Sequence, residues 1–196
     1  MPCRITLPVA LAATLAFGAL PAMAAMQSRE TPADVRAFAN ARLSLDQAVK
    51  AVQDDTGGIV VGAAFHAAPE FGFKPTYAAA PLVGYREGYL VTYIASNSVS
   101  VCFVDPRTGE AAQTAAVATT NYNPEGLSQS DYDALWHAPD LPQAVALAEQ
   151  RTGGRAIDAV AERRGGALGY RVGVVRDGRL SHEWVNPGAG QVASTN

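Results

Sequence analysis

The sequence predicts an α+β protein made of two copies of one unit, each a helix followed by a three-stranded antiparallel sheet, with the copies packed together. Residues 44–58 and 140–154 share seven of fifteen positions at a constant offset of 96. Residues 88–110 match residues 169–191 at a second constant offset of 81. Two ungapped matches at separate offsets favour an internal duplication over coincidence.

Each copy is predicted to open with a helix. Ser44 and Asp140 are good N-cap residues, and each has a glutamine three residues later, which is the capping-box arrangement. Apolar residues of the first copy recur at the i, i+3, i+4 and i+7 positions that share one helix face: Leu45, Ala48, Val49 and Val52. The glycine pairs at 57–58 and 153–154 then stop the two helices.

The rest of each copy predicts strands. A first strand fits residues 59–65 in one copy and 156–162 in the other. Alternating aromatic and β-branched residues over 89–93 and 99–103 then indicate a hairpin. In the second copy Asp177-Gly178 is a strong two-residue hairpin turn. Whether the two copies share one sheet is left open.

The predicted organisation divides the chain into six parts. These are a signal peptide (1–24), a leading segment with a short helix (25–42), the first copy with an insert at 66–85 (43–110), a connector with a short helix over 131–136 (111–138), the second copy (139–191) and a tail (192–196).

Residues 1–24 have the parts of a cleavable signal peptide. Arg4 precedes an apolar stretch that ends at Pro-Ala-Met-Ala, so cleavage is expected after Ala24 and the protein is expected to be periplasmic or secreted. A retained membrane anchor is the alternative, but the apolar run is short for a span of about 20 residues.

The charge of the remaining chain excludes some partners. The first 24 residues carry one Arg and no acidic residue, so the other 172 hold 14 Lys and Arg against 18 Asp and Glu, a net charge of −4. That balance argues against nucleic-acid binding. No second long apolar run follows, so no membrane span is expected after cleavage.

The closing part of each copy carries a family resemblance. Tyr-x-Val at 89–91 and Val-Asp-Pro-Arg-Thr-Gly-Glu at 104–110 resemble the PepSY domain, and Asn-Pro-Gly-Ala-Gly at 186–190 keeps the turn without the Asp and Thr. The resemblance implies a PepSY-like fold over 43–110 and 139–191. It also implies a non-catalytic module that binds or inhibits a partner, with a secreted peptidase as the suspected class. It transfers no catalytic residue.

The sequence offers little sign of catalysis. His66, His137 and His182 are scattered and have no ligand or base partner at helical spacing. Cys102 is the one cysteine beyond the signal, so an intramolecular disulfide and a thiolate zinc cage are excluded, and we predict a small apolar strand residue. We therefore predict no enzyme activity, catalytic residue, metal or cofactor.

The first functional hypothesis is an exported, non-enzymatic binding or inhibitory module that docks a protein or peptide through a sheet face, a sheet edge or the aromatic insert. The candidate contact residues are Phe71, Phe73, Tyr77, Tyr85 and His182. The alternative is a small-ligand-binding protein or a small enzyme with a pocket between the copies, where His182, Tyr170 and Asp105 would converge. His182 is read either as an inward residue with its polar atoms satisfied or as the mark of a small polar pocket.

Overall fold

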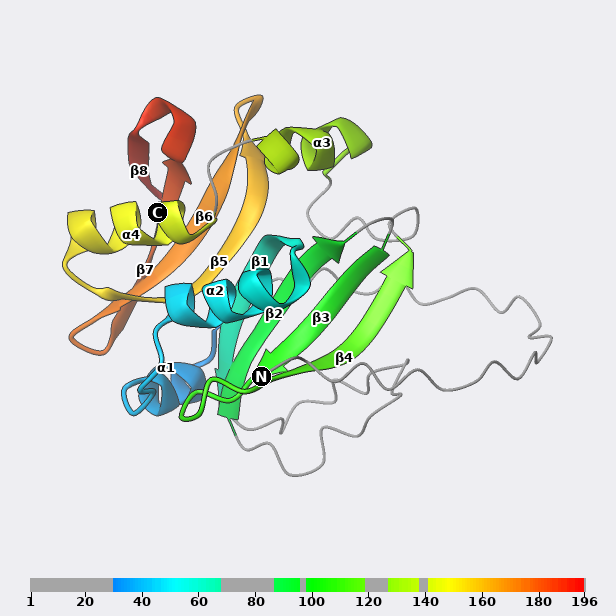
Figure 1. Cartoon of the computed structure of the whole chain (residues 1–196). Coiled ribbons are helices and arrows are strands. Elements are labelled where there is room, and N and C mark those ends of the chain that lie inside the picture. The colour runs from blue at the N-terminus through cyan, green and yellow to red at the C-terminus, as the bar shows by residue number, and fades with distance from the viewer. Residues whose placement is uncertain (1–29, 68–86, 96–97, 119–126, 138–140, 196) are drawn as a thin grey trace, which may run out of the picture.

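A single antiparallel sheet of eight strands forms the body of the computed structural model, which describes residues 30–67, 87–95, 98–118, 127–137 and 141–195 (Figure 1). The strand order is β4-β3-β2-β1-β5-β6-β7-β8. In chain order the elements are α1 (Pro32–Phe38), α2 (Leu45–Thr56), β1 (Ile59–Ala67), β2 (Glu87–Ala95), β3 (Ser98–Val104), β4 (Ala111–Ala118), α3 (Gln129–His137), α4 (Leu141–Thr152), β5 (Arg155–Arg164), β6 (Ala167–Arg176), β7 (Arg179–Asn186), the 3-10 turn η2 (Pro187–Ala189) and β8 (Gln191–Thr195).

The predicted fold of two units with three strands each is therefore wrong. Each half contributes four strands, and β1 of the first half pairs with β5 of the second, in the register Gly62↔Val160, Ala63↔Ala159 and Ala64↔Asp158. The fourth strands are β4, in the segment predicted as a connector, and β8, which lies mostly in the predicted tail. Alanine is depleted in strands, so the Ala-rich β4 gave only a weak strand signal.

The predicted helices are confirmed. α2 begins at the Ser44 capping box, where the Ser44 N–H donates to Gln47 Oε1 at 3.0 Å. α2 and α4 both end at a glycine in the left-handed region, with φ of +64° at Gly57 and +69° at Gly153. The leading helix and the connector helix are α1 and α3. None of the helices in the described ranges is long and apolar enough to cross a membrane.

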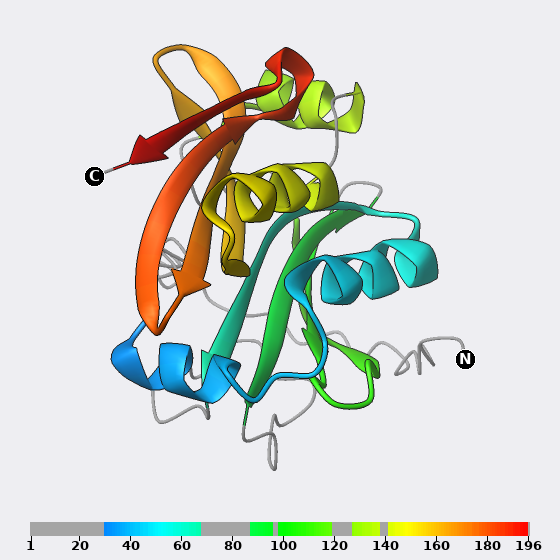
Figure 2. The same ribbon diagram turned by 90° about the vertical axis from the view of Figure 1, so that its left-hand side faces the viewer.

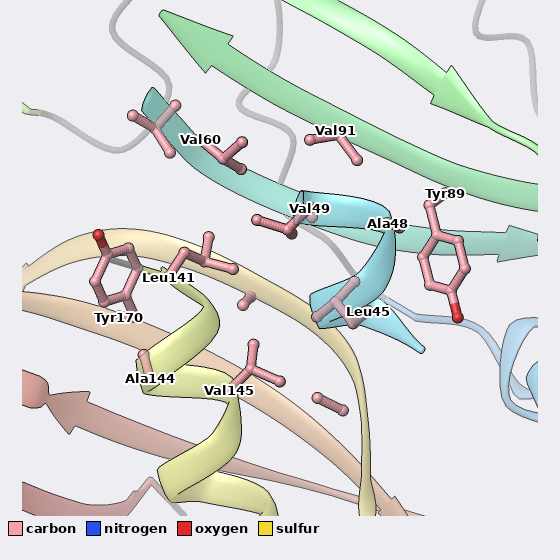
Figure 3. Close-up of a cluster of buried hydrophobic side chains, with 14 of the residues drawn as sticks. Leu45, Ala48, Val49, Val60, Tyr89, Val91, Leu141, Ala144, Val145 and Tyr170 are labelled. Carbon is pink, nitrogen blue, oxygen red and sulfur yellow. The ribbon is translucent and has the colours of Figure 1, made fainter. Parts of the chain in front are cut away.

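α2 and α4 lie side by side on one face of the sheet, with the hydrophobic core between helices and strands (Figure 2). α2 packs on β1 and β2, and α4 packs on β5 and β6. Figure 3 shows how the apolar sides of the two helices meet over the central strands, with the labelled residues Leu45, Ala48, Val49, Val60, Tyr89, Val91, Leu141, Ala144, Val145 and Tyr170. Cys102 of β3 belongs to this core, as an apolar strand residue would.

Positions that the sequence pairs have the same local geometry in both halves. The Thr56 hydroxyl donates to the Val52 carbonyl at 2.7 Å, and the Thr152 hydroxyl donates to the Ala148 carbonyl at 2.8 Å. The same hydroxyls accept the N–H of Gly58 and Gly154 at 3.1 and 3.2 Å. The two halves thus end their helices and start their first strands in the same way.

The glycines that open β2 and β6 also correspond. A Cβ on Gly88 would lie 2.2 Å from the Phe103 ring, and a Cβ on Gly169 would lie 2.8 Å from the Trp184 ring. The sequence pairs both the glycines and the aromatic residues. The hairpin turn at Asp177-Gly178 is confirmed, with φ of +53° and +72°, the two positive values that a type I′ turn requires.

α3 is held against β5 by one buried acid. Asp131 accepts hydrogen bonds from the Arg163 guanidinium and, at 2.8 Å, from the Ser128 N–H. These bonds, led by the Arg163 contact, lower the pKa of Asp131 to about 2. The short helix is therefore attached to the sheet by a charge pair as well as by the buried side chains of Tyr132 and Leu135.

Candidate functional site

A row of residues crosses four strands on the sheet face opposite α2 and α4. The register pairs Ala64 of β1 with Asp158 of β5, Asp158 with Gly173 of β6, and Gly173 with His182 of β7. Directly paired residues project to the same face of a sheet. Ala159 of β5 points to the core under the helices, so Asp158 and its row face the other way.

Gly173 allows the two polar side chains of this row to meet. A Cβ built on Gly173 would lie 1.7 Å from Asp158 Oδ1 and 3.4 Å from His182 Cδ2. The space above Gly173 is therefore occupied by the Asp158 carboxylate, with the His182 imidazole beside it. A residue with any side chain at position 173 would displace the carboxylate.

Arg171 and Glu30 complete what we call the polar cluster: Glu30, Asp158, Arg171 and His182. Arg171 Nη1 lies 3.3 Å from Asp158 Oδ2, and Arg171 Nε lies 3.7 Å from Glu162 Oε2 at the rim. His182 Nε2 lies 3.5 Å from Glu30 Oε2. One possible ligand atom from each of Glu30, Asp158 and His182 lies within 4.8 Å of the other two.

The position of Glu30 follows from the way α1 is anchored. Thr31 is the N-cap of α1, in a reciprocal capping box with Asp34. The Asp34 oxygen outside the capping box, Oδ1, accepts the N–H of Ala67 at 2.7 Å. This bond ties the start of α1 to the end of β1. Glu30 precedes this cap directly, so its side chain reaches the sheet face that carries Asp158 and His182.

The cluster is mostly enclosed. The side chains of Asp158 and Glu30 are 0% and 1% exposed, whereas those of Arg171 and His182 are 20% and 30% exposed. Neither Glu30 oxygen accepts a hydrogen bond from the residues that the structure describes. The acids thus lie inside, and the two basic side chains form the boundary with solvent.

The acids of the cluster favour a protonated His182. The Glu30 carboxylate raises the pKa of His182, and the Asp158 charge acts in the same direction against burial and the Arg171 charge. When His182 carries its proton, the carboxylates of Glu30 and Asp158 thus face two positive charges, those of His182 and Arg171. His66, near Asp34 and Glu30, behaves in the opposite way, because burial lowers its pKa more than those acids raise it.

A substitution at Gly173 tests this arrangement. Gly173→Ala is expected to lower the free energy of unfolding by about 1–3 kcal/mol, because the new methyl group overlaps the buried Asp158 carboxylate. Gly62→Ala on β1 is the matched control, since a Cβ there would lie 3.5 Å from Val160, an ordinary contact. Urea denaturation of both variants measures the difference, and equal stability would contradict the placement of Asp158.

The structure places only one of the predicted site residues in the cluster. His182 is there, but Tyr170 faces the core on the opposite side of β6 and is 2% exposed. Asp105 lies in the β3–β4 turn, where its Oδ1 accepts the N–H groups of Arg107 and Thr108 at 2.8 and 3.1 Å, the pattern of an Asx turn. The three residues of the pocket alternative are therefore not brought together. Phe71, Phe73, Tyr77 and Tyr85 lie outside the described residues.

Three members of the cluster were missed by sequence reasoning. Asp158 carried a signal, because it is an acid between Ile157 and Ala159 in an otherwise apolar run, where a charged strand residue needs a partner. Arg171 lies between Tyr170 and Val172 in the same way. Glu30 carried no signal, since it meets its partners across more than a hundred residues of chain.

Comparisons with known proteins add one distant likeness. No protein-family model matches the chain, and no curated protein matches it in sequence. Among solved structures, the fold is similar to the crystal structure of a candidate lipoprotein from Clostridium difficile 630, with a TM-score of 0.41 and 12% sequence identity. The match covers 79% of this chain and 92% of that one. Nothing about this chain's function is inferred from so distant a likeness.

Proposed function

We propose that this protein is an exported, non-catalytic binding module that holds an extended segment of a protein or peptide partner along the outer edge of β4. The observation that carries this proposal is the character of that edge. Among the residues that the structure describes, β4 ends the sheet on one side, and its eight residues, Ala111–Ala118, include neither a charge nor a proline. Natural edge strands are usually protected by such residues, and an unprotected edge is a template for strand addition.

The opposite edge is less suited to a partner strand. β8 has five residues, against eight in β4, and so offers fewer backbone groups to an added strand. The Arg151 guanidinium of α4 also donates to the carbonyl of Val192, the second residue of β8. β4 is thus the longer edge, and the proposal assigns the partner to it.

Two features of the sequence support the remaining parts of the proposal. The signal-like segment at residues 1–24 supports a periplasmic or secreted location. The PepSY resemblance at 89–91 and 104–110 supports a binding or inhibitory role, and it makes a secreted peptidase the partner class to test first. Tyr170, His182 and Asp105, the residues that the enzyme alternative named, lie apart, which supports a binding role over that alternative.

A pair of adjacent proline substitutions tests strand addition. On an antiparallel edge, neighbouring residues direct their N–H groups alternately toward the partner strand and away from it. Of Ala116→Pro and Val117→Pro, one therefore removes a hydrogen bond to β3, and the other removes an outward donor. We expect one variant to melt at a lower temperature and the other to keep the melting temperature of the unchanged chain.

The variant with the unchanged melting temperature is then used for capture from a periplasmic extract, quantified by mass spectrometry. It is expected to recover at least about tenfold less of the partner than the unchanged chain does. Ala193→Pro, on the β8 edge, is the control and should retain capture if it folds. Full capture by the folded β4 variant would overturn the strand-addition proposal. The proposal would also fail if the unchanged chain captured no partner and inhibited no secreted peptidase.

A further inference from the structure

The polar cluster contains a donor set that suits a divalent metal ion. Glu30 and Asp158 offer carboxylate oxygens and His182 offers an imidazole nitrogen, with the three atoms within 4.8 Å of one another. Ligand atoms bound at 2.0–2.2 Å around a tetrahedral Zn²⁺ lie about 3.5 Å apart. Closing the set around an ion therefore requires movements of about 1 Å, which side-chain rotation can supply.

The state of Glu30 points to a ligand independently of that spacing. Its side chain is 1% exposed, and neither of its oxygens accepts a hydrogen bond among the described residues. Burying a carboxylate without hydrogen bonds is unfavourable unless another charge compensates for it. The His182 ring at 3.5 Å, itself 30% exposed, compensates for only one of the two oxygens. An ion between the three side chains would provide the missing partner.

We propose that Glu30, Asp158 and His182 bind one divalent transition-metal ion, with Zn²⁺ as the preferred ion. The imidazole favours Zn²⁺ over Mg²⁺ and Ca²⁺, which prefer sets made of oxygen alone. Three protein ligands leave a fourth position open on the solvent side, where the half-buried His182 forms the boundary.

Arg171 contacts one oxygen of Asp158 and the carboxylate of Glu162, which is compatible with an ion bound at the other Asp158 oxygen. Its Nη1 lies 3.3 Å from Asp158 Oδ2, and its Nε lies 3.7 Å from Glu162 Oε2, so it can orient the Asp158 carboxylate while the remaining oxygen binds the ion. The ion binds the neutral imidazole of His182, so any proton on that ring is released to solvent as the ion binds.

The ion would join parts of the chain that are distant in sequence. Glu30 precedes α1, whereas Asp158 and His182 belong to β5 and β7 of the other half. A ligand that binds the folded chain and not the unfolded one stabilises the fold. Metal binding is thus expected to fix Glu30, just before α1, on the sheet face opposite α2 and α4.

The test uses the purified chain without a histidine tag, stripped of metal with EDTA and titrated with Zn²⁺, Mn²⁺ or Mg²⁺ by calorimetry. We expect one Zn²⁺ per chain, weaker binding of Mn²⁺ and none of Mg²⁺ at the same concentrations. At a Zn²⁺ concentration of about a hundred times the Kd, the melting temperature should rise by roughly 5–10 °C.

Single substitutions identify the ligands. Glu30→Gln and His182→Gln should each weaken Zn²⁺ binding at least about tenfold, whereas His137→Gln, on the exposed end of α3, should not change it. If a ligand variant does not fold, Co²⁺ bound to the unchanged chain gives a second readout, since a four-coordinate site has intense visible absorption. Zn²⁺ binding that survives both ligand substitutions, or no binding below about millimolar Zn²⁺, would overturn the proposal and leave the cluster as an ion-pair network. Neither result tests the proposal that a partner strand adds to the β4 edge.

Discussion

Replacing Phe65 with alanine is expected to lower the free energy of unfolding by about 3–5 kcal/mol. Phe65 is fully buried in β1, with its ring 5.4 Å from that of Phe38 in α1 and 5.3 Å from that of Tyr89 in β2, both edge to face. The substitution therefore removes the aromatic contacts that join α1 to β1 and β2. It also leaves a cavity that the closely packed neighbouring side chains cannot easily fill.

Trp136→Ala is the control for loss of a large aromatic side chain. Trp136 is 52% exposed on α3, so its replacement should change stability by less than about 0.5 kcal/mol. Urea denaturation monitored by far-ultraviolet circular dichroism suits both variants, because it does not depend on tryptophan fluorescence. A loss below about 1.5 kcal/mol for Phe65→Ala would show that Phe65 does not join α1 to the sheet as the structure has it.

The local elements could be predicted because their signals lie within a few residues of one another. The capping box at Ser44 and the glycines at 57 and 153 set the limits of the helices. Asp177-Gly178 indicated a hairpin turn, because these two residue types adopt the positive φ angles that the turn requires. Each of these signals acts through backbone groups near it in the chain, so no tertiary information was required.

The joining of the halves could not be predicted in the same way. It depends on three residue pairs between β1 and β5, Gly62↔Val160, Ala63↔Ala159 and Ala64↔Asp158, nearly a hundred positions apart in sequence. Apart from Asp158, these residues are small and apolar, and such residues are equally compatible with a sheet edge covered by a helix. Nothing in the local pattern distinguishes pairing between halves from packing of separate sheets.

The polar cluster was hidden for a related reason. His182 was singled out, but its partners come from β5, β6 and the segment before α1, and they meet only because the strand register aligns Asp158, Gly173 and His182. A one-residue shift in either pairing would move Asp158 or His182 to the helix-covered face. Its members therefore depend on the register, which the sequence did not determine.

Removal of the Arg171 charge is the second substitution with a large expected effect. Arg171→Met keeps an apolar stem of similar length and should lower the free energy of unfolding by about 3 kcal/mol, because the fully buried Asp158 then loses its nearest cation. Arg107→Met is the matched control. Arg107 is 68% exposed and lies 4.0 Å from a turn acid, and such a surface pair is worth about 1 kcal/mol or less.

The double variant Asp158→Asn/Arg171→Met separates charge from packing. If the loss comes from an uncompensated buried carboxylate, the double variant should be more stable than Arg171→Met alone, because the amide carries no charge to bury. Urea denaturation of Asp158→Asn, Arg171→Met and the double variant completes the double-mutant cycle. Equal losses for Arg171→Met and Arg107→Met would show that Asp158 does not depend on Arg171. An additive double variant would show that the arginine stem, and not its charge, stabilises the sheet face opposite α2 and α4.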